Sequence, residues 1–348
     1  MNRNSAEQKK TSIAACYTGN HEFSLNKNTI CTPSAGQVRI RVAWCGICGT
    51  DMHIFHGKMD ARVKPPQIIG HEMSGTIDAI GDGVEGWTLG DPVTVRPLDS
   101  CGSCPACLAG HSHVCMKLKF IGIDSPGAFQ ELWCVPAALL HRLPAALPLD
   151  RAALVEPLAV ACHDVRRARL CAGEKAVVLG GGPIGILVAL VAKSIGADVL
   201  LSEIDAGRRS FAESIGLRTL DPLTVDPVAA VESWTEGAGA DAVFECTAVP
   251  ACAELMTKLV RVRGRIVVVG IFSQPVAIDL FRFFWRELEL IGARVYEAAD
   301  FEQAVALALN IPIERLITGR YPLSAIADAF AAAPRGMKTL VDCRDVTR

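Results

Sequence analysis

The sequence predicts an α/β protein in which a mainly-β part surrounds an inserted, doubly wound parallel sheet, and three observations lead to this prediction. Up to about residue 150, short strand patterns alternate with glycine and proline turns. From residue 175 onward, long apolar strands alternate with alanine-rich helices, which is typical of a parallel sheet covered on both faces. The segment after residue 293 is too short to form a domain, so we expect it to pack back on the first part.

Each part of the chain contributes recognisable elements in order. The first part contains the strand patterns QVRIRVAWC, GTIDAIGDGV, DPVTVRP and QELWCVP. The inserted part begins with the strand KAVVLGG, the helix PIGILVALVAKSIGA and the strand DVLLSEIDA, and the same alternation continues through RRSFAESIG, DAVFECTA, ACAELMTKLV and GRIVVVGIF. The final part contains DFEQAVALALN, a strand near LITGRYPL, SAIADAFAAA and KTLVDC. We therefore predict one domain from residues 1–155 and 293–348 and a second from residues 156–292.

Composition excludes several classes of protein. The chain has 348 residues, half of them hydrophobic, which fits about two globular domains and excludes a largely disordered chain. Its net charge of −2 and its interspersed charges argue against nucleic-acid binding. The apolar stretch 176–192 is broken by glycines and a proline, so we expect no membrane segment. The polar N-terminal MNRNSAEQKK is interpreted as a frayed tail, and we expect a cytoplasmic protein.

The run CGSCPACLAGHSHVC suggests a structural metal site. Its four cysteines can converge on one tetrahedral ion, and an all-thiolate zinc site is closed and structural; they are Cys101, Cys104, Cys107 and Cys115, in a lobe at 96–117. The bacterial ferredoxin spacing differs, because there the fourth cysteine comes four residues after the third and precedes a proline, whereas Cys115 comes eight residues after Cys107 and precedes Met116. A disulfide framework fits a chain of this length poorly. We expect most other cysteines, such as Cys16, Cys134, Cys252 and Cys343, to be small buried hydrophobes.

A second, unlike set of ligands suggests a metal site that stays open. Cys48 lies in CGICGTDMH, and His71 and Glu72 are adjacent in IIGHEMSG. Zinc sites that mix thiolate, imidazole and carboxylate can keep a position free for water or substrate. Glu156, in LVEPLAVACH, competes with Glu72 for the role of carboxylate ligand, and we expect both near the ion. One closed and one open site predict an enzyme with two zinc ions per chain.

A glycine motif predicts a dinucleotide site. Gly180, Gly182 and Gly185 form G-x-G-x-x-G directly after a strand and at the start of a helix, where backbone can approach a pyrophosphate. Glu203 ends the next strand, where an acid can accept hydrogen bonds from the adenosine ribose. This acid would repel a 2′-phosphate, so we favour NAD over NADP. Arg208 can stack on adenine or, with Arg209, bind such a phosphate.

A nicotinamide accepts hydride more readily from an alkoxide than from a neutral alcohol, so the substrate hydroxyl must lose a proton. Zinc promotes this loss as a Lewis acid. Thr50 and His53 follow Cys48 closely, and we predict a proton relay from substrate through Thr50 and the cofactor ribose to His53. Surface positions are expected for His56, His111, His113 and His141.

Taken together, CGICGTDMH, GHEMSGTIDAIGDGV, the cysteine lobe, EPLAVACH and LGGGPIG resemble the zinc-dependent medium-chain dehydrogenase/reductase family over nearly the whole chain. The resemblance implies a GroES-like catalytic domain, an inserted Rossmann domain, substrate in the cleft between them, and a homodimer or homotetramer. EPLAVACH looks like the sorbitol and butanediol dehydrogenase branch. In sorbitol dehydrogenases the residues that match Cys48, His71 and Glu72 hold zinc, and the match of Glu156 lies near the zinc water and substrate. The same matching assigns NAD contacts to Pro183, Ile184, Glu203, Arg208, Val269, Gly270 and Ile271.

Two departures from the sorbitol enzymes concern the substrate. Ile54 replaces the tyrosine expected after the relay histidine, and Arg294 is displaced relative to Tyr296. We therefore expect an NAD-dependent zinc dehydrogenase that reversibly oxidises a secondary hydroxyl of a polyol or sugar-derived substrate to a ketone. The alternatives are an L-threonine or vicinal-diol dehydrogenase of the same family, although threonine dehydrogenases carry a different sequence at Glu156, and a noncatalytic zinc or cofactor-binding protein.

Overall fold

The computed structural model describes residues 11–346, so the N-terminal MNRNSAEQKK lies outside the described residues. The chain divides into two compact units, Met1–Glu156 with Leu316–Arg348, and Pro157–Arg315. Within residues 11–346, no helix combines the length and the apolar character that crossing a membrane requires.

The first unit is mainly β, as predicted. Its strands are β1 (Thr11–Gly19), β2 (Glu22–Thr29), β3 (Gln37–Gly46), β4 (Glu72–Ile80), β5 (Pro92–Val95), β6 (Leu98–Asp99), β7 (Lys119–Phe120), β8 (Leu132–Pro136), β9 (Leu140–Arg142), β16 (Ile317–Pro322) and β17 (Lys338–Asp342). Its helices are α1 (Gly49–Phe55), α2 (Pro105–Leu108), α3 (Leu149–Ala152), α11 (Ile326–Ala332) and the short 3₁₀ helices η1 (Ser112–Val114), η2 (Ala137–Leu139), η4 (Leu323–Ala325) and η5 (Ala333–Arg335).

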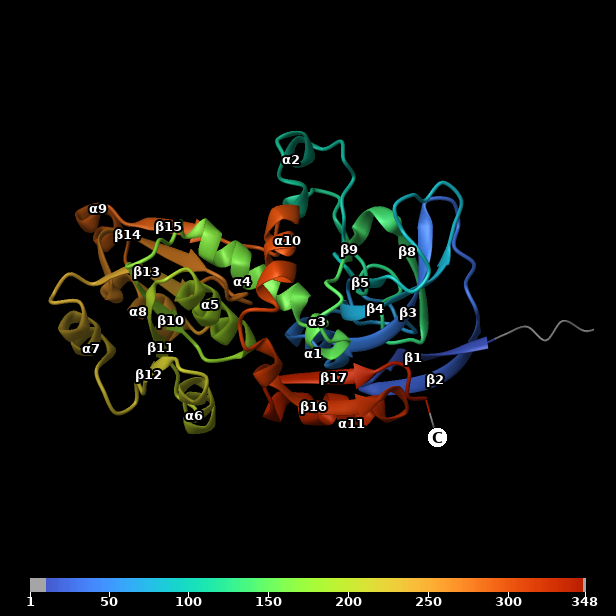
Figure 1. Ribbon diagram of the computed structural model, residues 1–348. Coiled ribbons are helices and arrows are strands. Elements are labelled where there is room, and N and C mark those ends of the chain that lie inside the picture. Colours follow the sequence, from blue (N-terminus) through green and yellow to red (C-terminus); the bar gives the residue numbers. More distant parts are fainter. Residues whose placement is uncertain (1–10, 347–348) are drawn as a thin grey trace, which may run out of the picture. The chain divides into compact units, whose positions relative to one another are not determined.

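Strand β3 organises the seven-stranded sheet of this unit. The sheet runs β16-β17-β3-β4-β5-β9, and β8 also pairs with β3. Apolar side chains such as Val38, Ile40 and Val42 alternate along β3 and are fully buried, which is the pattern predicted from QVRIRVAWC. Strand β17 pairs antiparallel with β3, so the end of the chain does return to the first part. Figure 1 shows β16, β17 and α11 in red beside β1 and β2 in blue, and the rings of Phe23 and Phe330 lie 4.7 Å apart there.

The second unit is the predicted parallel sheet. Its strands β10 (Lys175–Leu179), β11 (Asp198–Ser202), β12 (Arg218–Leu220), β13 (Ala240–Glu245), β14 (Val260–Val268) and β15 (Glu289–Gly292) pair in parallel in the order β12-β11-β10-β13-β14-β15. Its helices are α4 (Val155–Arg167), α5 (Pro183–Ser194), α6 (Ala206–Ser214), α7 (Pro227–Trp234), α8 (Pro250–Leu259), α9 (Leu280–Arg286), α10 (Ala298–Leu307) and η3 (Ile313–Leu316). Strand order reverses direction between β10 and β13, which is the arrangement of a doubly wound dinucleotide-binding sheet.

Continuous apolar runs explain why these strands lie in the middle of the unit. Val177, Val243 and Ile266 on three neighbouring strands are almost completely buried and pack with Met256 and Leu259 of α8. The helices begin at capped positions: Asp205 accepts a hydrogen bond from the backbone N–H of Arg208, and Asp226 accepts one from Val228. Because the six strands are parallel, their carboxyl ends lie at one edge of the sheet.

The return to the first unit comes later than the predicted residue 293. Residues 293–315 belong to the second unit, and the first unit resumes at Leu316. Asp300 of α10 holds this segment to α4, because it accepts from Arg166 at 2.6 Å and lies 2.8 Å from Nδ1 of His163. These ionic contacts join residues more than a hundred positions apart, and a pattern within one segment does not reveal them.

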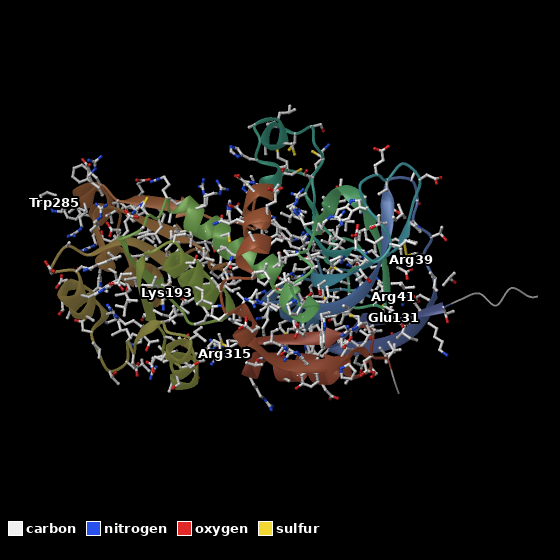
Figure 2. The ribbon with its side chains drawn as sticks, in the orientation of Figure 1. Arg39, Arg41, Glu131, Lys193, Trp285 and Arg315 are labelled. Carbon is white, nitrogen blue, oxygen red and sulfur yellow. A yellow bond between two sulfur atoms is a disulfide. The ribbon has the colours of Figure 1, made fainter. Side chains whose placement is uncertain are left out.

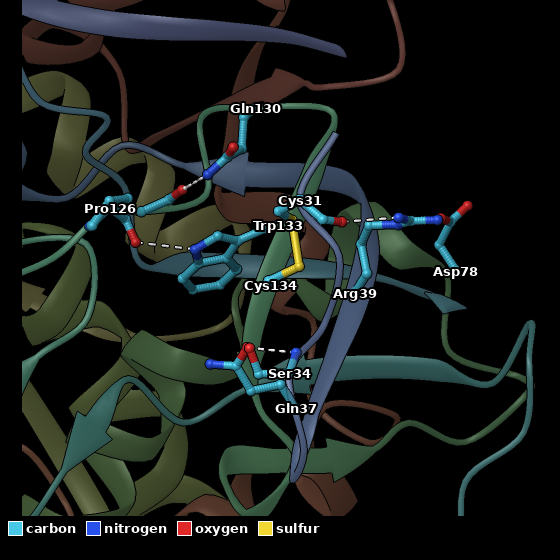
Figure 3. Close-up of a disulfide and its surroundings, with 10 residues drawn as sticks. Cys31, Ser34, Gln37, Arg39, Asp78, Pro126, Gln130, Trp133 and Cys134 are labelled. Atoms are coloured by element: carbon cyan, nitrogen blue, oxygen red, sulfur yellow. Dashed lines mark hydrogen bonds and ion pairs between the residues drawn. A yellow bond between two sulfur atoms is a disulfide. The ribbon is translucent and has the colours of Figure 1, made fainter. Parts of the chain in front are cut away.

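The cysteine predictions hold only in part. Cys16 and Cys343 are buried as expected, but Cys252 is half-buried, and Cys134 forms a disulfide with Cys31 (Figure 3). Cys134 lies opposite Arg39 in the β3–β8 pairing, and Arg39 donates at 2.9 Å to the carbonyl of Cys31. This pairing brings the segment that contains Cys31 onto β8, which a spacing of 103 residues does not suggest.

Candidate active site and metal centres

Cys48, His71 and Glu72 come together, and each can offer a ligand atom within 4.8 Å of the others. Cys48 precedes α1, while His71 and Glu72 stand at the start of β4, where Glu72 is paired with Gly46 of β3. A Cβ at Gly46 would lie only 2.4 Å from a carboxylate oxygen of Glu72, so a larger residue at position 46 would displace that carboxylate. Gly70 has a φ of +99° directly before His71, which turns the chain into the site.

Asp51 and Phe120 surround the His71 ring. Asp51 is completely buried; one of its oxygens accepts from the backbone N–H of Cys48 at 2.9 Å, and the other lies 3.6 Å from Nδ1 of His71. The ring of Phe120 meets His71 edge to face at 5.1 Å. Burial alone would lower the pKa of His71, but the charges of Asp51 and Cys48 outweigh burial and raise it well above its usual value. This concentration of negative charge favours a bound cation.

Lys338 of β17 pairs with Glu72. Its ammonium lies 2.5 Å from the Glu72 carboxylate and 3.3 Å from the carbonyl of Ile47, and both charged side chains are buried. Burial lowers the pKa of Lys338, but Glu72, Cys48 and Glu156 together raise it above its usual value. Sequence reasoning missed Lys338 and Asp51; a lone lysine in the apolar strand KTLVDC was the available signal for the first.

Buried atoms without hydrogen-bond partners test whether a metal fits this cluster. Nδ1 of His71 and Oδ1 of Asp51 make no hydrogen bond with any described residue, and Oε2 of Glu72 has none there beyond its 2.5 Å ion pair with Lys338. Thiolate, imidazole and carboxylate are the donors of zinc sites with an open position. The residues therefore fit a zinc ion held by Cys48, His71 and Glu72. Glu156 is buried and close enough to affect Lys338, but it is not among the three grouped residues, so its place near the ion stays a prediction.

The four cysteines of the lobe also converge. Sγ of Cys104 lies 3.5 Å from that of Cys107 and 3.8 Å from that of Cys115, and Cys115 lies 3.5 Å from Cys101. These separations are too long for disulfides, whose sulfurs lie about 2.05 Å apart, and they suit four thiolates around one ion. The pKa of Cys101 falls to about 6, chiefly because the backbone N–H of Ser103 donates to its sulfur, whereas burial and the neighbouring thiols raise that of Cys107 to about 11.

The glycine motif forms a tight turn between β10 and α5. A Cβ at Gly185 would lie 1.9 Å from the carbonyl oxygen of Gly180, whereas a Cβ at Gly182, the residue that precedes the helix, would meet open space. Glu203, which follows β11, accepts from the backbone N–H of Gly181 at 2.6 Å, and Arg208 lies 3.9 Å from its carboxylate. The acid expected beside the motif is therefore joined to the turn itself.

The segment Val269–Ile271 follows β14 at the same edge of the sheet. The backbone N–H groups of Val269 and Gly270 both donate to the carbonyl of Glu245, and Ile271 is 82% exposed. A free helix N-terminus, an acid and an exposed loop thus surround the carboxyl ends of β10, β11 and β14, where doubly wound sheets bind dinucleotides.

Comparison with known families agrees with this arrangement. Residues 34–145 match the alcohol dehydrogenase GroES-like domain, and residues 183–310 match the zinc-binding dehydrogenase domain. The chain belongs to the zinc-binding dehydrogenase family. The protein is therefore an oxidoreductase that acts on a CH–OH group, and its family uses zinc and NAD(P). The predicted fold class and family are confirmed.

Three similar proteins represent this dehydrogenase family. The 2-dehydro-3-deoxy-L-galactonate 5-dehydrogenase of Pseudoalteromonas atlantica is 56% identical, over 95% of this chain and 98% of its own. The sorbitol dehydrogenase of Halalkalibacterium halodurans is 34% identical, over 91% and 94%. A zinc-binding dehydrogenase from Sinorhizobium meliloti 1021, solved bound to NADP, is 32% identical with a TM-score of 0.89, over 96% and 99%.

The predicted relay residues lie on one short helix of this dehydrogenase. Thr50 is half-buried in α1, and His53 is exposed one turn later. Partial burial, then the charges of Lys58 and His56, lower the pKa of His53. Of the four histidines expected at the surface, His56 and His111 are exposed, whereas His113 is buried within the cysteine lobe and His141 is half-buried. The polarity of a histidine side chain was therefore a poor guide to its exposure. Burial, and then the charge of Arg96, lower the pKa of His141 to about 4.

Proposed function

We propose that this dehydrogenase oxidises a secondary hydroxyl of a sugar-derived acid to a ketone, with the 5-hydroxyl of 2-dehydro-3-deoxy-L-galactonate as the substrate to test first. The observation that carries the proposal is the 56% identity to an enzyme of that name over 95% of this chain. The same family similarity supports polyol oxidation in general, through the sorbitol dehydrogenase relative. The two departures at Ile54 and Arg294 fit a substrate other than sorbitol.

The proposed catalytic centre is the cluster of Cys48, His71 and Glu72. A zinc ion held there would act as a Lewis acid and lower the pKa of a substrate hydroxyl. Asp51 would orient the His71 ring, and Lys338 would hold the Glu72 carboxylate in place, because each is buried against its partner. Glu156, buried and near Lys338, would face the substrate side without being a permanent ligand.

Proton removal is assigned to α1. The Thr50 hydroxyl would accept the substrate proton, and His53, one turn further and exposed, would pass it to water. The lowered pKa of His53 supports this role, since the imidazole is neutral and able to accept a proton at neutral pH.

The cofactor proposed is NAD. Gly180, Gly182 and Gly185 would receive the pyrophosphate with the segment 183–184, and 269–271 would border the nicotinamide half. Glu203 is held beside the turn by the N–H of Gly181, so a 2′-phosphate would approach a carboxylate. Because a similar dehydrogenase was solved bound to NADP, both NAD and NADP are included in the assay.

A second zinc and self-association complete the proposal. Cys101, Cys104, Cys107 and Cys115 would hold a structural zinc, supported by their convergent sulfurs. A homodimer or homotetramer is supported by the exposed apolar side chains of α9, where Phe281 and Trp285 stack at 5.9 Å. Figure 2 labels Trp285 at the surface of the second unit. Cytoplasmic location stays a prediction from the sequence.

The proposal is tested by following NADH formation with 2-dehydro-3-deoxy-L-galactonate, sorbitol, 2,3-butanediol and L-threonine, each with NAD and NADP. We expect turnover of the sugar acid with NAD. Turnover of threonine or butanediol instead would favour the alternative substrates, and turnover of none would contradict the substrate class. Metal analysis on the same sample should give about two zinc ions per chain, as two centres of this family type imply.

Two substitutions separate the metal centres. Cys48→Ala should abolish turnover and leave NAD binding and the second zinc in place, whereas Cys104→Ser should remove the lobe zinc. Cys171→Ala is the matched control, because Cys171 is an exposed free thiol far along the chain from both sets. Full activity of Cys48→Ala would contradict the assignment of the catalytic centre.

A further inference from the structure

The second unit contains a cavity of about 270 Å³ between α7, α8, α9 and the start of β14. The buried side chains of Val231, Leu259 and Val260 border it on the inside. Three cationic side chains also line it, Lys258 at the end of α8 and Arg282 with Arg286 on α9. The two arginines stand one helical turn apart and therefore face the cavity together.

Three positively charged side chains line this cavity, against one negatively charged side chain, Glu232. Within residues 11–346, none of Lys258, Arg282 and Arg286 forms an ion pair, although Glu232 also lines the cavity. The Nε of Arg286 is buried and has no hydrogen-bond partner among the described residues. Arg282 donates from Nε to the carbonyl of Thr257 at 3.0 Å, which fixes its guanidinium against α8. A buried donor without a partner is costly, so this position favours an acceptor from outside the chain.

The cavity lies at the edge of the sheet opposite the glycine motif. Its residues Gly237–Gly239 lead into β13, and Lys258–Val260 lead into β14, so the cavity lies at the amino ends of these strands. Gly180–Gly185 instead follow the carboxyl end of β10, and β10, β13 and β14 are parallel. An occupant of the cavity would therefore be separate from a dinucleotide bound at the motif.

We propose that this cavity is a second ligand site, which binds a small organic polyanion bearing a phosphate group or several carboxylates. Guanidinium groups match the oxygens of both anions in a fork geometry, and two from adjacent turns can grip one anion. The apolar side would contact the carbon skeleton. The volume lies near the lower end of small-molecule pockets, about 300 to 1,000 Å³, and so excludes a dinucleotide. Occupation would stabilise the folded unit by mass action.

Pyrophosphate and citrate are the two probes, titrated into the full-length enzyme by calorimetry and thermal unfolding at constant ionic strength and with saturating NADH. NADH occupies the glycine motif, so phosphate binding there does not contribute. We expect at least one probe to bind with a millimolar or tighter Kd and to raise Tm. Pyrophosphate alone would assign a phosphate ligand, and citrate alone a polycarboxylate. Failure of both to bind would overturn the proposal.

Variants test whether the cavity is responsible. Arg286→Gln should raise the Kd of the probe at least tenfold, and Arg286→Lys should raise it less. Lys258→Ala should also raise the Kd, and because Lys258 is exposed, this variant carries little risk to folding. Arg263→Gln is the matched control, since it removes one exposed positive charge of the same unit that pairs with Glu287 outside the cavity. Equal losses in Arg263→Gln and Arg286→Gln would mean nonspecific attraction and would reject the site. Binding that occurs only when NADH is left out would likewise assign the anion to the glycine motif and reject the site.

Discussion

Glu72 and Lys338 form a buried ion pair whose two members come from opposite ends of the chain. The pair is compatible with a stable fold only while both charges are present, because a buried charge without its partner is strongly destabilising. Lys338 therefore has two effects: it compensates a carboxylate in the core, and it fixes that carboxylate beside Cys48 and His71.

Replacing Lys338 by Met should lower the free energy of unfolding by about 3 to 5 kcal/mol, because Glu72 would be left buried and unpaired. It should also lower zinc content, since the carboxylate loses its orientation. Urea unfolding and metal analysis measure the two effects. Lys64→Met, at an exposed lysine, should change stability by less than about 0.5 kcal/mol. An equally small effect at Lys338 would show that the ion pair is not maintained in solution.

His53 should govern the acid side of the pH profile. Only the neutral imidazole accepts a proton, so kcat/KM should fall as pH decreases through the pKa of His53. That pKa is lowered from 6.5, by partial burial first, so the fall should lie below pH 6.5. His53→Gln should reduce kcat/KM and remove this limb, whereas His56→Gln, exposed at the end of the same helix, should keep it. An unchanged limb in His53→Gln would exclude His53 from the relay.

At the scale of single elements, the turn between β10 and α5 contains one glycine that packing requires and one that borders the proposed cofactor site. Gly185 is needed because its α-carbon lies against the carbonyl of Gly180, whereas Gly182 borders open space and has a φ of −70° that any residue adopts. Two glycines of one motif therefore have different physical reasons to be glycine.

Gly185→Ala should lower the free energy of unfolding by about 1 to 3 kcal/mol through overpacking. Gly182→Ala should leave stability within about 0.5 kcal/mol but weaken NAD binding, because the added methyl group occupies the space for the pyrophosphate. Denaturant unfolding and NADH fluorescence titration measure these quantities on the same samples. Normal NAD affinity in Gly182→Ala would argue against pyrophosphate binding at this helix terminus.

At the scale of the molecule, the Cys31–Cys134 disulfide closes a long stretch of the first unit. The two cysteines are 103 residues apart, and the chain-entropy description gives about 4.7 kcal/mol for a loop near this length. Disulfides are rare in the cytoplasm, where thiols are kept reduced. The first unit thus has a cross-link whose presence depends on redox conditions.

Reductant should lower the free energy of unfolding of the first unit by up to about 4.7 kcal/mol in urea unfolding. The double variant Cys31→Ser with Cys134→Ser should unfold like the reduced protein and should no longer respond to reductant. Thiol counting under denaturing conditions, with and without reductant, checks that the bond forms. A response to reductant that persists in the double variant would assign the effect to other cysteines, such as the lobe thiols.

The sequence by itself determined the fold class and the family, and it predicted the residues of the proposed sites. Apolar periodicity predicted β3, β10 and α5, because side-chain spacing is set locally by strand and helix geometry. Ligand spacing predicted the cysteine lobe, because donors within a short loop converge with little help from the rest of the fold, whereas Cys48 meets His71 and Glu72 through the pairing of β3 with β4.

Only the tertiary structure decided the features that join distant segments. Lys338 reaches Glu72 because β17 pairs with β3, Asp300 extends the second unit to residue 315 because it binds α4, and Cys31 meets Cys134 because β8 pairs with β3. The cationic cavity likewise combines α7, α8 and α9. Long-range ion pairs and strand pairings leave no periodicity in the chain, since each partner reads locally as an ordinary polar or small residue.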